Sequence, residues 1–328
     1  MTIFHSPWGL TKIDTLKSVG TLKSGSTLAD HLKSPLLIDV SKQGVTQMPV
    51  YGLHKWRVML IAAVVAGLAA LAAPARADTV WIGGSGAATA LMRLLAAAYE
   101  QQHPQEKIIV NAALGSRGGI KALNAGAIDL ALIGRPLHEH ELAGGLAEIE
   151  FARTPLAVAV PAANPVSDIT FAQLATHYAG TSAAWPDGNR VRVVLRSRDD
   201  TDSRMLASFS PSMAQALDAA LARPGMFVAI NDEDAAAAIV RLPGAIGTVT
   251  LAQIVAGRLP LKALTLAGLP PSVEAIRSGR YPYYKRLFMV TSKLATPTTK
   301  RFISFVQSRE GARILTAHGC WVGGFTGS

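Results

Sequence analysis

The sequence predicts an α/β protein with two lobes, joined by a two-strand hinge over a cleft. Apolar strand-like segments, glycine-bearing or polar loops and helix-like segments alternate along most of the chain, which favours sheets covered by helices. The chain has 328 residues, of which 49% are hydrophobic and 16% charged, and can therefore bury more than one core. Two longer apolar segments, 154–165 and 283–291, can carry the chain into a second lobe and back.

The first lobe begins with two repeats of this pattern. Residues 79–82 predict a strand, 83–90 a glycine-rich loop, and apolar side chains at helical spacing then predict a helix. Those side chains are Leu91, Leu94, Leu95, Ala98 and Tyr99. The second repeat consists of a strand at 107–114, a loop at 115–119, a short helix at 120–126 and a strand at 128–133. In a parallel sheet the loops that follow these strands meet at one edge.

The second lobe repeats the pattern with polar loops. Residues 191–197 predict a strand, 198–203 a polar loop and the residues from Arg204 onward a helix. An acid-capped helix, a Pro-Gly turn and a strand are expected within 231–251. We therefore divide the folded chain into 78–156 (first part of lobe 1), 157–285 (lobe 2) and 286–328 (return strand and C-terminal part of lobe 1).

The N-terminal residues are expected to lie outside this fold. Residues 48–77 resemble a secretory signal peptide, because Lys55 and Arg57 precede an apolar stretch at 58–73 and a small-residue cleavage signal at 75–77. Cleavage before Asp78 would export the protein to the periplasm, and an uncleaved segment would anchor it to the membrane. Residues 1–47 show no targeting signal or packed domain, and we interpret them as an unstructured or mis-annotated extension.

Charge and composition exclude several classes of protein. Of the 32 Lys and Arg residues eight precede Asp78, and of the 22 Asp and Glu residues three do, so the remainder carries a net charge of only +5. The sequence has no run of five like charges and no basic patch interleaved with aromatic residues. It therefore does not predict a nucleic-acid partner. The single cysteine, Cys320, cannot form an internal disulfide and predicts a small buried side chain. His138 and His140 predict a solvated helix start and no metal site.

Three loops between a predicted strand and a predicted helix predict an anion site. They are 84–89, 116–119 and 196–203, and each offers helix-end amides and a hydroxyl, while two also offer an arginine. A tight glycine turn is the alternative for each loop taken alone. The first loop is no dinucleotide site, because Thr89 stands where the third glycine or alanine of that motif belongs. No cofactor is expected.

A cluster of carboxylates, Asp199, Asp200 and Asp202, leaves two interpretations open. It could assist hydrolysis or hold a divalent ion, or it could cap a helix and pair with neighbouring arginines. No nucleophile-elbow motif accompanies it, so we expect no enzyme.

The sequence from about Val80 to Gly319 resembles the phosphate-binding proteins of phosphate ABC transporters, which have the type 2 periplasmic binding protein fold with a mixed sheet in each lobe. "GGSGAAT" is similar to the family's first ligand loop and "LGSRGGIKAL" with "AIDLALIGRPL" to its second block. "VVLRSRDDTDSR" occupies the place of its arginine-plus-Ser-Gly-Thr motif, and "PGAIGTV" and "GRYPYYKRLFMVT" resemble later landmarks.

This resemblance implies the ligand-binding residues. Ser116 would give its hydroxyl and amide, Ala88 and Thr89 their amides, and Arg196 a guanidinium, with hydroxyls from the second lobe. The full expected set is Gly86, Ala88, Thr89, Ser116, Arg117, Gly118, Arg135, Arg196, Thr201, Asp202 and Ser203.

Two departures bear on the anion. Where many members place an aspartate that accepts the proton of monohydrogen phosphate, this chain has Gly134, and the Ser-Gly-Thr motif reads Thr201-Asp202-Ser203. We expect Asp202, or alternatively Asp200, to supply the missing acceptor; an Asp202 that caps its helix instead would open the site to another oxyanion. The resemblance implies a monomer that captures phosphate, or sulfate, molybdate or tungstate, for a membrane permease. A sensor protein of the same fold and a secreted phosphoester hydrolase are the alternatives.

Overall fold

The computed structural model describes residues 78–323. The expected extension at 1–47, the signal peptide at 48–77 and the last five residues lie outside this range. No helix among residues 78–323 is long and apolar enough to cross a membrane.

The strands are β1 (Asp78–Gly84), β2 (Glu106–Ala113), β3 (Leu130–Ile133), β4 (Leu146–Pro161), β5 (Asp168–Ile169), β6 (Arg192–Val193), β7 (Leu195–Arg196), β8 (Val228–Ala229), β9 (Ala245–Thr250), β10 (Leu261–Ala263), β11 (Thr265–Leu266) and β12 (Tyr284–Ser292). The helices are α2 (Gly86–Gln102), α3 (Gly115–Asn124), α4 (Glu139–Ala143), α5 (Phe171–Ala179), α6 (Thr201–Ala207), α7 (Pro211–Ala222), α8 (Asp232–Arg241), α9 (Leu251–Ala256), α10 (Val273–Arg277), α11 (Pro297–Val306) and α12 (Arg309–Ala317).

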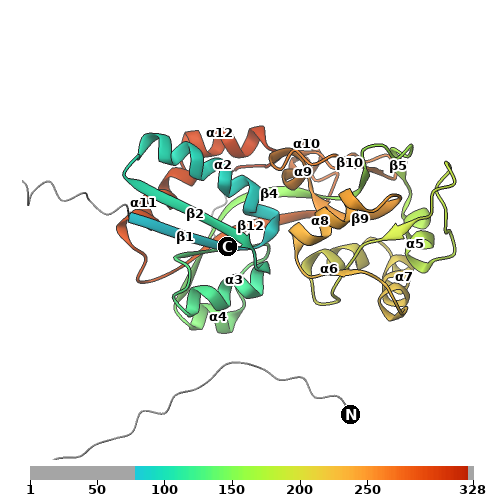
Figure 1. Cartoon of the computed structure of the whole chain (residues 1–328), viewed down its shortest axis with the longest axis horizontal. Coiled ribbons are helices and arrows are strands. Elements are labelled where there is room, and N and C mark those ends of the chain that lie inside the picture. Colours follow the sequence, from blue (N-terminus) through green and yellow to red (C-terminus); the bar gives the residue numbers. More distant parts are fainter. Residues whose placement is uncertain (1–77, 324–328) are drawn as a thin grey trace, which may run out of the picture. The chain divides into compact units, whose positions relative to one another are not determined.

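One mixed sheet runs through the described part of the chain in the order β2-β1-β3-β12-β4-β9-β6, with β10 also paired to β4 (Figure 1). β1 is parallel to β2 and β3, whereas β12 is antiparallel to both β3 and β4. The long strand β4 pairs with β12 through residues 146–155 and with β9 through residues 156–159. β4 thus connects what we call the first half (β1 to β3, α2 to α4, α11 and α12) to the second half (β5 to α10).

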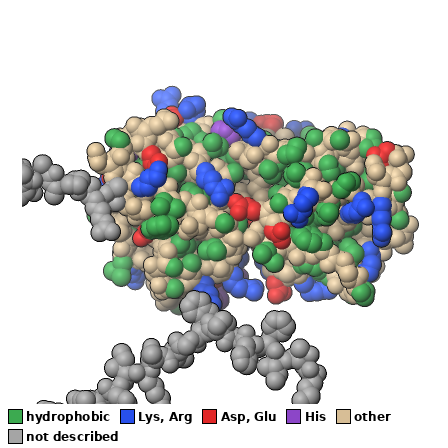
Figure 2. Space-filling view, viewed as in Figure 1, with side chains coloured by type: hydrophobic (Ala, Val, Ile, Leu, Met, Phe, Trp, Pro, Cys, Tyr) green, Lys and Arg blue, Asp and Glu red, His purple; other side chains and the backbone are tan. Residues whose placement is uncertain are grey.

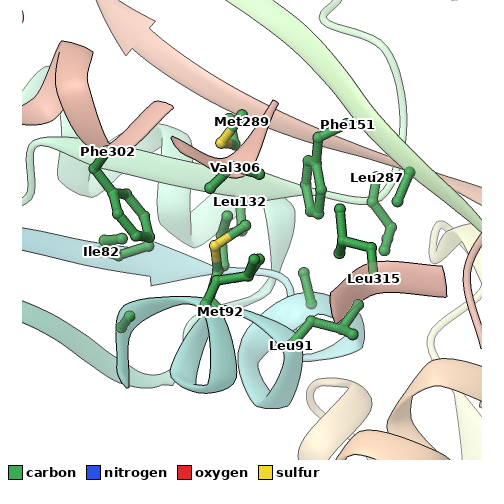
Figure 3. Close-up of a cluster of buried hydrophobic side chains, with 14 of the residues drawn as sticks. Ile82, Leu91, Met92, Leu132, Phe151, Leu287, Met289, Phe302, Val306 and Leu315 are labelled. Atoms are coloured by element: carbon green, nitrogen blue, oxygen red, sulfur yellow. The ribbon is translucent and has the colours of Figure 1, made fainter. Parts of the chain in front are cut away.

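The first half has a hydrophobic core between its sheet and helices α2, α11 and α12 (Figure 3). Leu91 and Met92 of α2 and Phe302 of α11 are fully buried against Ile82 and Leu132 of the strands. α3 covers the opposite face, where Ile120 and Leu123 pack. The predicted helical spacing after residue 90 is confirmed, and Cys320 is buried in this core as expected.

The second half has its own buried clusters. Leu174 of α5 and Met213 of α7 pack with Val158 of β4, and Ile239 of α8 packs with Val249 of β9. The α/β class with a mixed sheet is therefore confirmed, while the lobe divisions after residues 156 and 285 stay predictions.

The glycines that follow β1 and β2 serve close packing. Gly84 has φ +131°, and a Cβ there would lie 2.1 Å from the carbonyl oxygen of Leu132. A Cβ on Gly119 would lie 2.7 Å from the Cα of Gly84. Only glycine at both positions lets α3 lie against the end of β1.

Local structure differs from the sequence expectation at three places. α3 begins at Gly115 and α6 at Thr201, earlier than predicted, so Ser116 and Thr201 lie in first helical turns. The predicted strand 191–197 is divided at Val194, because β6 pairs with β9 whereas β7 pairs with β8 in a separate two-stranded sheet.

Candidate functional site

A cavity of about 480 Å³ opens between the two halves, at the ends of β1, β3 and β7. Both halves contribute residues to its wall, and so does β12. Figure 2 shows acidic and basic side chains interspersed over the face in view. The lining residues are Ser85, Leu114, Gly115, Ser116, Arg117, Gly134, Arg135, His138, His140, Glu141, Arg196, Ser197, Asp199, Asp200, Thr201, Arg204, Ile230, Asp232 and Lys285.

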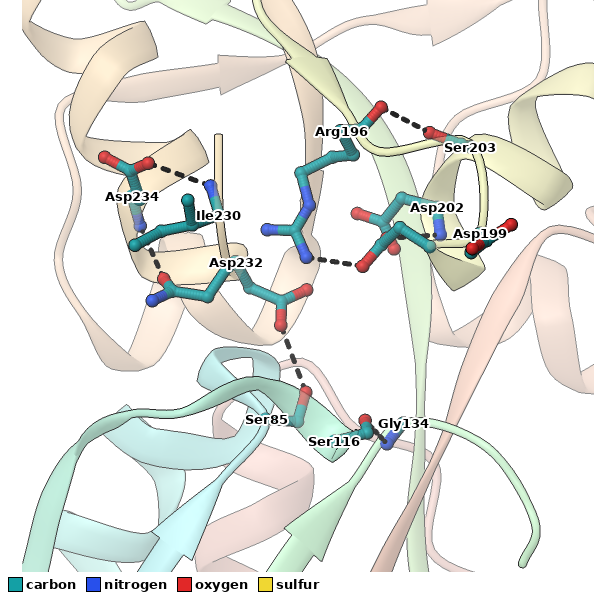
Figure 4. A network of polar contacts seen from close by, with 12 residues as sticks. Ser85, Ser116, Gly134, Arg196, Asp199, Asp202, Ser203, Ile230, Asp232 and Asp234 are labelled. Carbon is teal, nitrogen blue, oxygen red and sulfur yellow. Dashed lines mark hydrogen bonds and ion pairs between the residues drawn. The ribbon is translucent and has the colours of Figure 1, made fainter. Parts of the chain in front are cut away.

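Arg196 offers the cavity two unpaired hydrogen-bond donors. Its residue is 5% exposed, and its Nη2 donates to Asp200 Oδ2 at 2.5 Å. Its Nε and Nη1 have no partner among the described residues. A buried charged donor without an acceptor is costly, so this guanidinium is poised for an anion that enters the cavity (Figure 4).

The turn after β7 fixes this guanidinium. Asp200 caps α6 by accepting from the amide of Asp202 at 2.9 Å while it also pairs with Arg196. Ser203 Oγ donates to the carbonyl oxygen of Arg196 at 3.0 Å. The same short segment therefore orients both the charged group and its counter-ion.

Lys285 connects β12 to the second half at the cavity. It is 2% exposed on β12, and its Nζ forms ion pairs with Asp202 and Asp232. Thr248 Oγ1 donates to Asp202 Oδ2 at 3.2 Å, and Ser85 Oγ donates to Asp232 Oδ2 at 3.1 Å. The buried cation is thus held by carboxylates from α6 and α8.

The pKa values of Asp202 and Asp232, the two carboxyl groups that contact Lys285, are shifted in opposite directions. Burial raises the pKa of Asp202 above its usual range, and Asp232 and Asp200 add to this although Lys285 opposes it. Burial also acts to raise the pKa of Asp232, but Lys285 and Arg196 more than offset it and hold that pKa far below its usual value. Asp232 is therefore ionised at neutral pH.

The first-half wall is held by its own polar contacts. Ser116 Oγ accepts from the amide of Gly134 at 3.0 Å, which connects α3 to the end of β3. Arg135 donates to both carboxylate oxygens of Glu141, at 2.8 and 2.9 Å. This pair, opposed by burial and aided by the amide of His138, lowers the pKa of Glu141 to about 2. His138 caps α4, as the predicted helix start requires.

The N-terminus of α8 contacts the first half directly. Asn231 Nδ2 donates to the carbonyl oxygen of Ala113 at 3.0 Å, and Glu233 Oε2 accepts from the amide of Ala113 at 2.9 Å. Glu233 also lies 3.5 Å from Arg93 Nη1, and a Cβ on Gly86 would lie 2.8 Å from the amide nitrogen of Glu233. These contacts hold the two halves together beside the cavity.

The structure brings part of the predicted ligand set together. Five of the residues line the cavity: Ser116, Arg117, Arg135, Arg196 and Thr201. Six do not: Gly86, Ala88, Thr89, Gly118, Asp202 and Ser203. The amide of Ala88 donates to the carbonyl oxygen of Ser85, as does the Thr89 hydroxyl. Roles in ligand binding for the whole set stay predictions.

The ligand set expected from sequence lacks Ser85, Asp232 and Lys285, although Ser85 lies in the predicted anion loop 84–89. The sequence predicts Asp232 only as part of a helix cap. Lys285 had a local signal, because along β12 it shares the inward alternation of the buried Leu287. A lysine at such a position needs a buried counter-ion.

Comparison with known proteins agrees with this architecture. Residues 69–310 match the family described as the PBP superfamily domain, so the chain belongs to that family. The phosphate-binding protein PstS of Bacillus subtilis is 26% identical over 237 residues, which cover 70% of this chain and 75% of that protein.

Two solved structures share the fold. A putative phosphate ABC transporter substrate-binding protein from Clostridium perfringens, with bound phosphate, has a TM-score of 0.62 at 22% identity, covering 75% of this chain and all of that one. The periplasmic molybdate-binding protein of Azotobacter vinelandii has a TM-score of 0.56 at 14% identity, covering 74% and 99%. The resemblance of fold that the motifs implied is confirmed.

Proposed function

We propose that this protein captures inorganic phosphate in the cavity at Arg196 and delivers it to a membrane ABC permease. The observation that carries the proposal is the pair of unpartnered, buried donors on Arg196, which face a cavity between two halves of a binding-protein fold. Hydrogen bonds to a charged group contribute about 1.5–3 kcal/mol each. A few of them, with the Ser116 hydroxyl nearby, suffice for the roughly 8 kcal/mol of a micromolar site.

The carboxylates at the cavity favour phosphate over other oxyanions. Asp200 and Asp232 line it, and each carboxylate oxygen can accept a hydrogen bond in addition to its present partner. Monohydrogen phosphate has a proton to donate to these carboxylates, whereas sulfate, molybdate and tungstate have none, so the carboxylates would repel them. Asp202, the acceptor expected from sequence, forms an ion pair with Lys285 and does not line the cavity.

The relatives support the remaining parts of the proposal. The names of the Bacillus subtilis and Clostridium perfringens proteins assign them to phosphate binding or phosphate transport, and neither names an enzyme. We therefore propose a monomeric, exported binding protein without catalytic activity, which works with a permease. Another oxyanion remains the alternative ligand, since the molybdate-binding neighbour shares the fold.

Isothermal titration of the purified full chain with phosphate, sulfate, molybdate and tungstate tests the proposal. We expect micromolar or tighter binding of phosphate and weaker binding of the other three. Tight binding of molybdate and no binding of phosphate would make molybdate the ligand in place of phosphate. If none of the four anions binds, the proposal is wrong. Turnover of a chromogenic phosphate ester would show instead that the protein is a hydrolase.

A further inference from the structure

The cavity is larger than inorganic phosphate requires. A water molecule takes about 30 Å³ of liquid volume, and a tetrahedral oxyanion of five heavy atoms displaces only a few waters. The cavity of about 480 Å³ lies instead in the range of roughly 300–1,000 Å³ that is typical of sites for organic ligands.

This volume remains although the two halves already meet. Asn231 and Glu233 contact Ala113, and Ser85 contacts Asp232, across the same junction that borders the cavity. The two halves are therefore in contact beside a cavity of this volume.

The cavity has a buried floor and an exposed mouth. Arg196, Lys285, Asp232 and Ser85 are all 5% exposed or less and form the floor. The mouth includes Ile230, which is 84% exposed, and the exposed residues Leu114, Arg117, Ser197 and Asp199.

The mouth offers partners for an uncharged, hydroxyl-bearing group. The carboxylate of Asp199 has no hydrogen-bond or ion-pair partner among the described residues, and Asp200 lies beside it with free acceptor capacity. Leu114 and Ile230, one from each half, provide apolar surface for a short carbon chain.

We propose that the cavity binds small phosphate monoesters of polyols in addition to inorganic phosphate, an inference that rests on the proposed function. The phosphoryl group lies against Nε and Nη1 of Arg196, and the organic group extends towards the mouth. Its hydroxyls donate to Asp199 and Asp200, which replaces the proton that inorganic phosphate supplies.

Titration of the full chain with sn-glycerol 3-phosphate, inorganic phosphate and glycerol tests this inference. We expect glycerol 3-phosphate to bind at least as tightly as phosphate and glycerol not to bind. Asp199→Ala should weaken glycerol 3-phosphate about tenfold and leave phosphate unchanged, while Asp187→Ala, an exposed aspartate away from the cavity, should change neither.

A second variant keeps the test independent of hydrogen bonding. Ser197→Trp fills the mouth at an exposed position whose side chain makes no hydrogen bond to any of residues 78–323. This variant should exclude glycerol 3-phosphate while phosphate still binds. If phosphate binds but glycerol 3-phosphate binds more than about tenfold more weakly, the inference is wrong and the proposed function stands. If neither binds, both are wrong. Equal loss of both ligands in Ser197→Trp, with the fold intact by circular dichroism, would also overturn the inference.

Discussion

Ser85, in the turn between β1 and α2, donates a hydrogen bond to Asp232 at the first position of α8, with 3.1 Å between the oxygens. The two residues are 147 positions apart in sequence. Asp232 in turn pairs with Lys285 of β12. Through this contact the glycine-rich turn of the first half, the ionic cluster and the guanidinium of Arg196 belong to one site.

Arg196→Gln should weaken phosphate binding by about 2–4 kcal/mol, because the anion loses a buried charged donor pair. Isothermal titration measures the loss. Arg198→Gln is the matched control: Arg198 pairs with Asp218, and both side chains are more than half exposed and outside the cavity. Equal affinity in the parent and the Arg196 variant would contradict the placement of the anion.

Lys285→Met should lower the free energy of unfolding by about 3–5 kcal/mol, since it leaves Asp202 and Asp232 buried without their cation. Urea denaturation followed by circular dichroism measures this change. Lys293→Met, at an exposed position just beyond β12, should have little effect. Adding Asp232→Asn to Lys285→Met should recover part of the loss; a further loss would show that Asp232 is not the partner that matters.

The contribution of Glu141 to stability should depend on pH. Its pKa is lowered to about 2 from an ordinary 4.5, chiefly by the Arg135 hydrogen bonds. A carboxyl group with a lowered folded-state pKa stabilises the fold above its unfolded pKa and loses that contribution as pH falls. The difference in unfolding free energy between the parent and Glu141→Gln should therefore be constant from neutral pH to about 5 and shrink as pH falls towards 2. A difference that does not change with pH would refute this.

Asn231→Ala should cost about 1 kcal/mol of stability through the lost helix cap and should also weaken phosphate binding, because α8 presents Asp232 to the cavity and Asn231 ties it to Ala113. Thermal melts and titration give the two values. Ser210→Ala removes the cap of α7, which has no residue in the cavity, and should lower stability alone. Similar binding losses in both variants would indicate a general effect of destabilisation.

Asp200→Asn should reduce the preference for phosphate over sulfate, because in the proposed site this carboxylate accepts a hydrogen bond from monohydrogen phosphate and repels sulfate. Asp202→Asn tests the acceptor expected from sequence, and we expect a smaller change because this carboxylate faces Lys285. Competitive titrations provide the ratio of the two dissociation constants. A larger change in Asp202→Asn would assign the acceptor to Asp202.

The sequence predicted the features that depend on local pattern. Alternating strands, loops and helices indicated the α/β class. The start of α3, the segment after β3 and the end of β7 contribute Ser116, Arg135 and Arg196 to one cavity. β2 and β3 are both parallel to β1 in one sheet, so the segments that follow these strands meet at one edge. β7 belongs to a separate two-stranded sheet with β8, and this argument does not place it.

The remaining features depend on contacts between distant segments. Lys285 lies 53 residues beyond Asp232, and no local pattern pairs them. The division of the predicted strand at Val194 follows from two different partners, β9 and β8, which propensity cannot distinguish. The placement of Asp202 behind the cavity likewise follows from a lysine on another strand.

A crystal structure of the full chain with phosphate tests the central claim most directly. We expect an oxyanion within hydrogen-bond distance of Nε and Nη1 of Arg196, between Ser116 of the first half and Asp200 of the second. A cavity that stays empty at saturating phosphate, or an anion bound away from Arg196, would contradict it.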